Sequence, residues 1–207
     1  RDGVVLAAEK KVTSKLLEQD KSSEKIFQLS ENVLAGVAGM TADANSLVNY
    51  ARNAAQKYLL SYDDNIPVEQ LVQRLCDLKQ GYTQFGGLRP FGVSLLIAGF
   101  DAVRGPSLYQ VDPSGSYFMW KASAMGKNMT NAKTFLEKRY SDDISLEDAI
   151  HTAILTLKEG FEGQMTEKTI EIGIVGHATK SIVGEGKEPI PVFRRLTEQE
   201  VKDYLAL

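Results

Sequence analysis

One stretch of the sequence, residues 79–100, constrains the fold more than any other because it changes character twice. It reads KQGYTQFGGLRPFGVSLLIAGF and begins inside a segment with helical spacing, residues 67–84. Apolar side chains recur in that segment at intervals of three and four, the period of an amphipathic helix: Val68, Leu71, Val72, Leu75, Leu78 and Tyr82. Residues 93–99 are mostly apolar, which is typical of a strand buried on both faces. The sequence therefore predicts a helix and a core strand joined by a short connection.

The connection has the composition of a tight turn. Gly86 and Gly87 can adopt positive φ without a steric penalty, and Pro90 disfavours the α conformation for Arg89. The helix should therefore end near Gln84, and at least one of the two glycines is expected at positive φ. On composition alone, this turn is an ordinary surface connection that carries an exposed arginine.

The rest of the chain alternates short strands with pairs of helices. Strands are predicted over residues 3–8, 26–29, 33–38, 108–111, 117–120, 170–175 and 190–193, with the first buried and the last two at sheet edges. Helices are predicted from Thr41 to the break at 63–65, over about 128–140, after the capping box of Ser145 and Asp148, and after that of Thr197 and Glu200. This order indicates an α+β fold with sheets packed on each other and helices outside.

Length, charge and cysteine content exclude several classes of protein. The 207 residues, 43% hydrophobic and 25% charged, can bury a full core and fit one domain over residues 1–207. A net charge of −3 offers no basic surface for nucleic acid or a membrane, and no apolar run reaches the roughly 20 residues of a membrane span. A lone cysteine, Cys76, excludes an intrachain disulfide and is interpreted as a structural thiol in a reducing compartment.

No pattern in the sequence predicts catalysis, a cofactor or a metal site. His151 and His177 are far apart and, with one cysteine, give no metal-ligand spacing. Gly126-Lys127 lacks the glycine and hydroxyl residues that a phosphate loop needs around it. The aspartate pairs at 63–64 and 142–143 lie in turn contexts, where aspartate commonly bonds to the local backbone.

Several motifs together resemble one family. YTQFGGLRPFG at residues 82–92 is similar to the YTQ-x-x-G-x-RP-x-G segment of α-type subunits of the 20S proteasome. SEKIFQL at 23–29, AGMTADAN at 38–45, DPSG at 112–115 and WKA at 120–122 fit the same family in order and spacing. Residues 66–87, IPVEQLVQRLCDLKQGYTQFGG, most resemble the eukaryotic subtype called alpha type-4.

The resemblance implies a fold and a lack of catalysis. The fold would be the four-layer α-β-β-α sandwich of N-terminal-nucleophile hydrolases, with an N-terminal tail, a first helix and a first strand missing before Arg1. Enzymes of that superfamily use an N-terminal threonine whose free amine acts as the base, and Arg1 supplies none. Lys25 and Glu9 fall where catalytic relatives carry a lysine and an acid. We therefore expect a non-catalytic member of the family.

The resemblance also implies two binding roles. The turn made of Phe85, Gly86, Gly87, Leu88 and Arg89 would join those of neighbouring subunits in a pore annulus through which substrates enter. Lys25, with Gly39 and Met40, would line a pocket between α subunits that receives the C-terminal carboxylate of an activator. Without the family, Lys25 would be interpreted as an exposed turn lysine.

The expected function is that of a non-catalytic α-ring subunit in ubiquitin-dependent protein degradation, in cytoplasm and nucleus. Its expected partners are other α subunits in a seven-membered ring, β-ring subunits, and a regulatory particle or another activator. We expect no nucleic-acid partner and no membrane partner. Two alternatives remain open, an active threonine peptidase of the β type and a free-standing binding domain of the same fold.

Overall fold

The computed structural model describes residues 2–10, 16, 24–177 and 191–206, and within them the chain forms two antiparallel sheets covered by helices. The strands are β1 (Gly3–Glu9), β2 (Ile26–Ser30), β3 (Val33–Gly39), β4 (Val93–Asp101), β5 (Gly105–Val111), β6 (Tyr117–Met119), β7 (Ile170–His177) and β8 (Pro191–Arg195). The helices are α1 (Thr41–Tyr62), α2 (Val68–Gln84), α3 (Met129–Arg139), α4 (Leu146–Glu159) and α5 (Glu198–Ala206).

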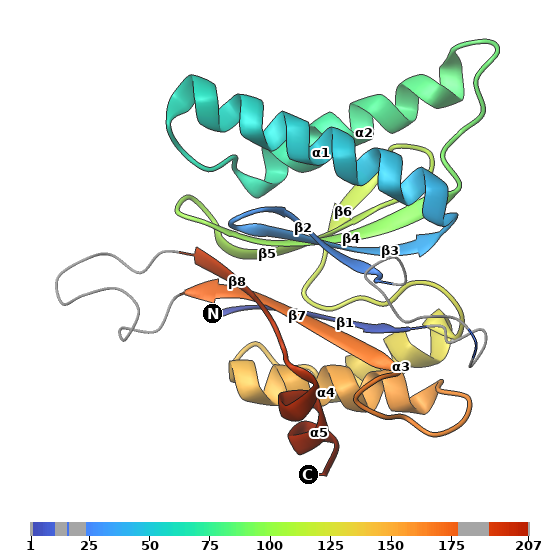
Figure 1. Cartoon of the computed structure of the whole chain (residues 1–207), viewed down its shortest axis with the longest axis vertical. Coiled ribbons are helices and arrows are strands. Elements are labelled where there is room, and N and C mark those ends of the chain that lie inside the picture. Colours follow the sequence, from blue (N-terminus) through green and yellow to red (C-terminus); the bar gives the residue numbers. More distant parts are fainter. Residues whose placement is uncertain (1, 11–15, 17–23, 178–190, 207) are drawn as a thin grey trace, which may run out of the picture.

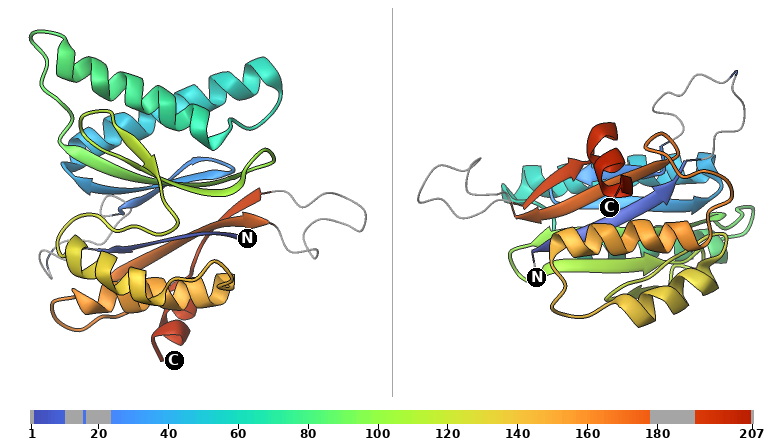
Figure 2. Two further views of the ribbon diagram at one scale, coloured as in Figure 1. Left: turned by 180° about the vertical axis from the view of Figure 1, so that it is seen from behind. Right: turned by 90° about the horizontal axis from the view of Figure 1, so that it is seen from below.

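These elements stack in four layers. One sheet has the strand order β2-β3-β4-β5-β6 and the other the order β1-β7-β8. The two sheets face each other, α1 and α2 cover the outer face of the larger one, and α3, α4 and α5 lie beyond the smaller one (Figures 1 and 2). This is the α-β-β-α sandwich that the resemblance implies.

Three hydrophobic clusters fill the spaces between the layers. One packs α1 and α2 on the larger sheet, one lies between the two sheets, and one packs α4 and α5 on the smaller sheet. Strand β4 contributes Ile97 to the first cluster and Ala98 to the second, so it is buried on both faces as predicted. Each large aliphatic side chain buried in this way stabilises the fold by roughly 1.5–3 kcal/mol.

The predicted helices α1 and α2 form because their apolar stripes match the helical period. In α1 the buried stripe is rich in alanine, which allows the close approach of the helix to the sheet. In α2 the buried positions follow the spacing of three and four: Val68, Leu71, Val72, Leu75, Cys76 and Lys79. Leu78 and Tyr82, which the helical spacing places on the same face, are only partly buried. The lysine in this stripe was not anticipated.

Two predictions about strand position are wrong. β7 is not an edge strand, because it lies between β1 and β8, with Ile172 opposite Ala7 on one side and Val175 opposite Phe193 on the other. β1 is not a fully buried strand, since Leu6 is its only buried residue. Both errors concern the pairing of β1 with β7, two strands that are far apart in the sequence. No local sequence pattern indicates which distant strands pair. Of the strand predicted over 190–193, residue 190 lies outside the described residues.

Candidate functional site

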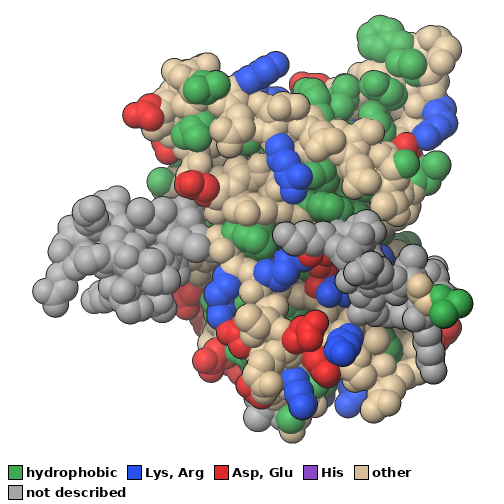
Figure 3. Space-filling model, viewed as in Figure 1, with side chains coloured by type: hydrophobic (Ala, Val, Ile, Leu, Met, Phe, Trp, Pro, Cys, Tyr) green, Lys and Arg blue, Asp and Glu red, His purple; other side chains and the backbone are tan. Residues whose placement is uncertain are grey.

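The turn after α2 projects from the body of the molecule. The helix ends where the Phe85 amide donates to the Gly81 carbonyl at 3.0 Å, and residues 85–90 are all exposed. Apolar side chains gather at the upper right corner of Figure 3, where Figure 1 places this turn. Phe85 and Leu88 are 65% and 50% exposed. Gly87 has φ 82°, which confirms the predicted positive φ, and Gly86 is not among the positive-φ residues.

The base of the turn is closed by aromatic packing. Phe91 is buried, and its ring centroid lies 4.4 Å from that of Tyr82 on α2. Because Tyr82 precedes the turn and Phe91 follows it, their contact pins both ends of the connection together. The tip is therefore exposed, while Phe91 is part of the core and Tyr82 packs against it.

Arg89 is tied to the start of α1. Its guanidinium donates to both carboxylate oxygens of Asp43, at 2.7 and 2.9 Å, and the Gly92 amide donates to the same carboxylate at 2.8 Å. These bonds hold the pKa of Asp43 well below its usual range, at about 2, with the Arg89 hydrogen bond as the largest cause. Arg89 is 62% exposed at its side chain, but it is an anchored residue and not a stray surface arginine.

Lys25 lies just before β2, and its backbone is held by a buried carboxylate. The Lys25 carbonyl accepts from the Val37 amide at 3.0 Å, while Glu171 on β7 accepts from the amides of Lys25 and Ile26. Glu171 also accepts from Arg195 at 3.1 Å. Burial raises the pKa of Glu171, and the Lys25 amide and the Arg195 charge oppose that shift. Among the described residues, no carboxylate forms an ion pair with the Lys25 ammonium.

Gly39 and Met40 follow at the end of β3. Gly39 has φ 128°, and a Cβ on it would stand 2.3 Å from the Gly92 carbonyl oxygen, so the close approach of these two segments requires glycine. The Met40 amide donates to that carbonyl at 2.9 Å, and Met40 is 50% exposed. Because Lys25 pairs with Val37 on the same strand, the structure brings Lys25, Gly39 and Met40 to one end of the β2–β3 pair.

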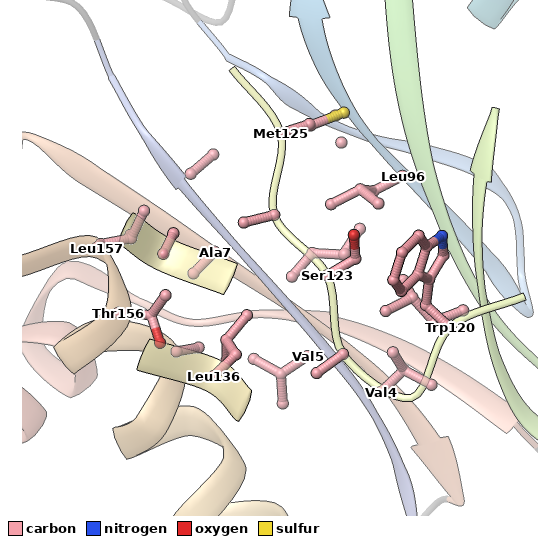
Figure 4. Close-up of a pocket in the computed structure, with 18 of the residues that line it drawn as sticks. Val4, Val5, Ala7, Leu96, Trp120, Ser123, Met125, Leu136, Thr156 and Leu157 are labelled. Carbon is pink, nitrogen blue, oxygen red and sulfur yellow. The ribbon is translucent and has the colours of Figure 1, made fainter. Parts of the chain in front are cut away.

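Lys25 and Gly39 also border a cavity of about 1010 Å³ that lies along β1. Figure 4 shows it between β1, which carries Val4, Val5 and Ala7, and the segment that carries Trp120, Ser123 and Met125. Leu136, Thr156 and Leu157 close it from α3 and α4. Glu9 is a further lining residue, so the lysine and the acid that match catalytic positions border one space.

The described part of the chain offers little else for chemistry. Over those residues, no group of three or more His, Cys, Asp and Glu side chains could hold a metal ion. In the same part of the chain, no helix is both long and apolar enough to cross a bilayer.

Three contacts could not be predicted from the sequence: the Asp43–Arg89 pair, the Glu171–Arg195 pair, and the bond that the buried Lys79 ammonium donates to the Val93 carbonyl. All three depend on residues that tertiary structure brings together. The only signal for the first was an aspartate in the first turn of a helix, where the helix dipole alone would explain it.

The comparisons with known proteins place the chain in a family. Residues 1–175 match the proteasome subunit family, and the chain therefore belongs to it. It is 56% identical to proteasome subunit alpha type-2-A of Arabidopsis thaliana over 205 residues, 99% of this chain and 81% of the relative. It is 54% identical to proteasome subunit alpha type-2 of Drosophila melanogaster over the same shares of the two chains. With the Dictyostelium discoideum alpha type-2 subunit it shares 52% identity over 99% of this chain and 82% of the relative.

These relatives confirm the α type and the absence of a catalytic role: the chain is an α-type, non-catalytic subunit of the 20S proteasome. They contradict the predicted resemblance to alpha type-4, because these relatives are all named alpha type-2. That prediction depended on residues 66–87, most of which form α2. The apolar positions of α2 are set by packing on the sheet, so they do not distinguish one α subtype from another.

Proposed function

We propose that the subunit serves the α ring in two ways, as a contributor to the substrate entry pore and as a docking site for an activator. Its partners in this proposal are other α subunits in a seven-membered ring, the β-ring subunits, and a regulatory particle or other activator. The compartments are the cytoplasm and the nucleus. The observation that carries the proposal is the projecting turn, whose exposed tip stands on a closed base.

The pore role is supported by the chemistry of the tip. Phe85 and Leu88 are exposed apolar side chains on backbone that is anchored on both sides, by the Tyr82–Phe91 contact and by the Arg89–Asp43 pair. An unfolded polypeptide presents apolar side chains and backbone, and a firmly held apolar tip can contact it in many registers. The positions proposed for the annulus remain Phe85, Gly86, Gly87, Leu88 and Arg89.

A crosslinking experiment tests the pore role. A photoreactive amino acid at Phe85 or Leu88, in assembled particles, should capture an unfolded polypeptide during translocation. The matched control is Val103, which is 83% exposed on the turn between β4 and β5. Equal capture at Val103 and Leu88, or none at Leu88, would contradict the role.

The docking role is supported by the arrangement of Lys25, Gly39 and Met40. The Lys25 backbone is fixed from two sides, by Val37 and by Glu171, so its ammonium extends from a rigid base. An ammonium and an exposed methionine together suit a peptide that ends in a carboxylate beside an apolar residue. A charge-assisted hydrogen bond of this kind contributes roughly 1.5–3 kcal/mol.

Removal of the ammonium tests the docking role. Lys25→Ala should weaken activator binding at this pocket roughly tenfold or more and leave ring assembly unchanged. The control Lys138→Ala removes an exposed lysine of α3. Because other pockets of the ring can mask a loss at one, the decisive preparation carries the change at every equivalent lysine. Unchanged affinity in that preparation would refute the role.

A further inference from the structure

Two segments with separate proposed roles meet at one carboxylate. The Asp43 carboxylate accepts three hydrogen bonds, two from Arg89 and one from the Gly92 amide, at 2.7 to 2.9 Å. The Gly92 carbonyl in turn accepts from the Met40 amide at 2.9 Å. A continuous path of hydrogen bonds therefore links the pore turn, residues 85–92, to the docking segment, residues 39–41. It runs through Arg89, Asp43 and Gly92 to Met40.

Steric contact tightens the same junction. A Cβ on Gly92 would stand 2.7 Å from the sulfur of Met40, and a Cβ on Gly39 would stand 2.3 Å from the Gly92 carbonyl oxygen. The two segments are thus as close as backbone allows. A shift of residues 39–41 toward Gly92 requires a matching shift of Gly92, because the two segments leave no gap between them.

The carboxylate at the junction depends on Arg89. The Asp43 side chain is only 10% exposed, and Arg89 supplies the sole ion pair that it forms among the described residues. Removing the Arg89 guanidinium leaves the shielded Asp43 carboxylate with only the Gly92 amide as a hydrogen-bond donor, so the structure around it must rearrange. A change at Arg89 should therefore reach Asp43 and Gly92, and through them Met40.

We propose that Asp43 is a positioning residue that couples the docking segment, residues 39–41, to the pore turn, residues 85–92. This inference rests on the proposed function and adds a regulatory link to it: occupation of the pocket at Met40 stiffens the pore turn. Because coupling between two sites is reciprocal, a looser turn lowers the affinity of the pocket for the activator. Arg89 thereby acts on docking although its side chain is anchored to α1 and does not line the pocket.

The test uses assembled particles in which the lysines equivalent to Lys25 in the other α subunits are replaced by alanine, so that this pocket alone can bind. In these particles this subunit carries Arg89→Ala, Arg89→Lys or Asp43→Asn. The control is Arg104→Ala, which breaks another arginine–carboxylate pair, Arg104 with Glu69 at 2.7 Å. Two quantities are measured: amide hydrogen exchange of residues 39–47, and the affinity of a synthetic peptide that ends in a free carboxylate. Lys25→Ala, measured in parallel, reports whether the peptide docks at the proposed pocket.

The proposal predicts faster exchange at Met40 in Arg89→Ala and an affinity for the peptide that is lower by about fivefold or more. Arg89→Lys should recover part of both, and Arg104→Ala should change neither. If Met40 exchange and affinity stay normal in Arg89→Ala while Lys25→Ala loses affinity, docking stands and the coupling is refuted. If Lys25→Ala keeps full affinity, the docking role is refuted, and Met40 exchange alone decides whether the two segments move together.

Discussion

The ammonium of Lys79 lies 2.8 Å from the carbonyl oxygen of Val93 and is fully buried. Burial lowers the pKa of Lys79 from 10.5 to about 8, with the neighbouring Cys76 and Asp112 opposing the shift. Lys79 occupies a core position of α2, where an aliphatic side chain would satisfy the packing. The pairing with Val93 ties the middle of α2 to the first residue of β4.

Replacing Lys79 by methionine should change how stability depends on pH. A lysine whose pKa is lower in the folded state loses its proton earlier there, so the unfolded state binds more protons between pH 8 and 10.5. Stability of the original chain should therefore rise with pH across that window, relative to Lys79→Met, by roughly 3 kcal/mol. Chemical denaturation at several pH values measures this. If the free energy of unfolding changed with pH in the same way in both chains, the buried charge would be contradicted. Lys138→Met, at an exposed lysine, is the control.

Gly87→Val should strain the pore turn, and Gly86→Val should not. A Cβ at either glycine meets no atom within 4 Å, so space is equal at both positions, but only Gly87 has positive φ, at 82°. A β-branched residue there costs roughly 1–3 kcal/mol. Both variants should unfold cooperatively, with a lower melting temperature only for Gly87→Val. We also expect Gly87→Val to slow translocation of unfolded protein more than passage of short peptides. Identical behaviour of the two variants would be evidence against this view of the turn.

Cys76 should resist thiol reagents while the chain is folded. It is 5% exposed, and burial raises its pKa from 9.0 to about 11. The thiolate fraction near neutral pH is then roughly 100-fold below that of the unfolded chain, and restricted access slows reaction further. Mass spectrometry after brief alkylation measures this. A cysteine introduced at Leu88, which is 50% exposed, should react at once under the same conditions; comparable rates at both positions would overturn the prediction.

The subunit should have no peptidase activity of its own. Its relatives are α-type subunits of the proteasome, and the chain belongs to their family. A threonine-directed covalent inhibitor should label catalytic chains of an assembled particle and leave this chain unlabelled. Recovery of a labelled peptide from this chain would restore the β-type peptidase alternative.

Local patterns predicted most of the fold. Local spacing predicts helices α1 and α2, the hairpin of β2 and β3, and the caps at Ser145 and Thr197. The Gly-Gly pair predicts positive φ at one glycine at least, and the structure shows it at Gly87. Each depends on interactions within a few residues, and these are visible in sequence.

Long-range contacts could not be predicted in the same way. The pairing of β1 with β7 and the clamp of Glu171 on Lys25 join opposite ends of the chain. The burial of Lys79 could not be predicted for another reason. Its position fits the helical spacing of the buried face, but a charged residue does not indicate a core position. For the candidate site, the turn itself was predicted, and its attachment to Asp43 was not.

Because the two ends of the pore turn are held together by core residues, the stability of the fold depends little on the residues at the tip. Tyr82 and Phe91 hold the ends together by a core contact, while residues 85–88 between them are all exposed. The tip can therefore be rewritten, lengthened or given a new charge with little effect on the sandwich beneath it. The turn is therefore a suitable site for loop grafting: the subunit would hold the ends of a grafted tip in place, and the graft would change only the exposed surface.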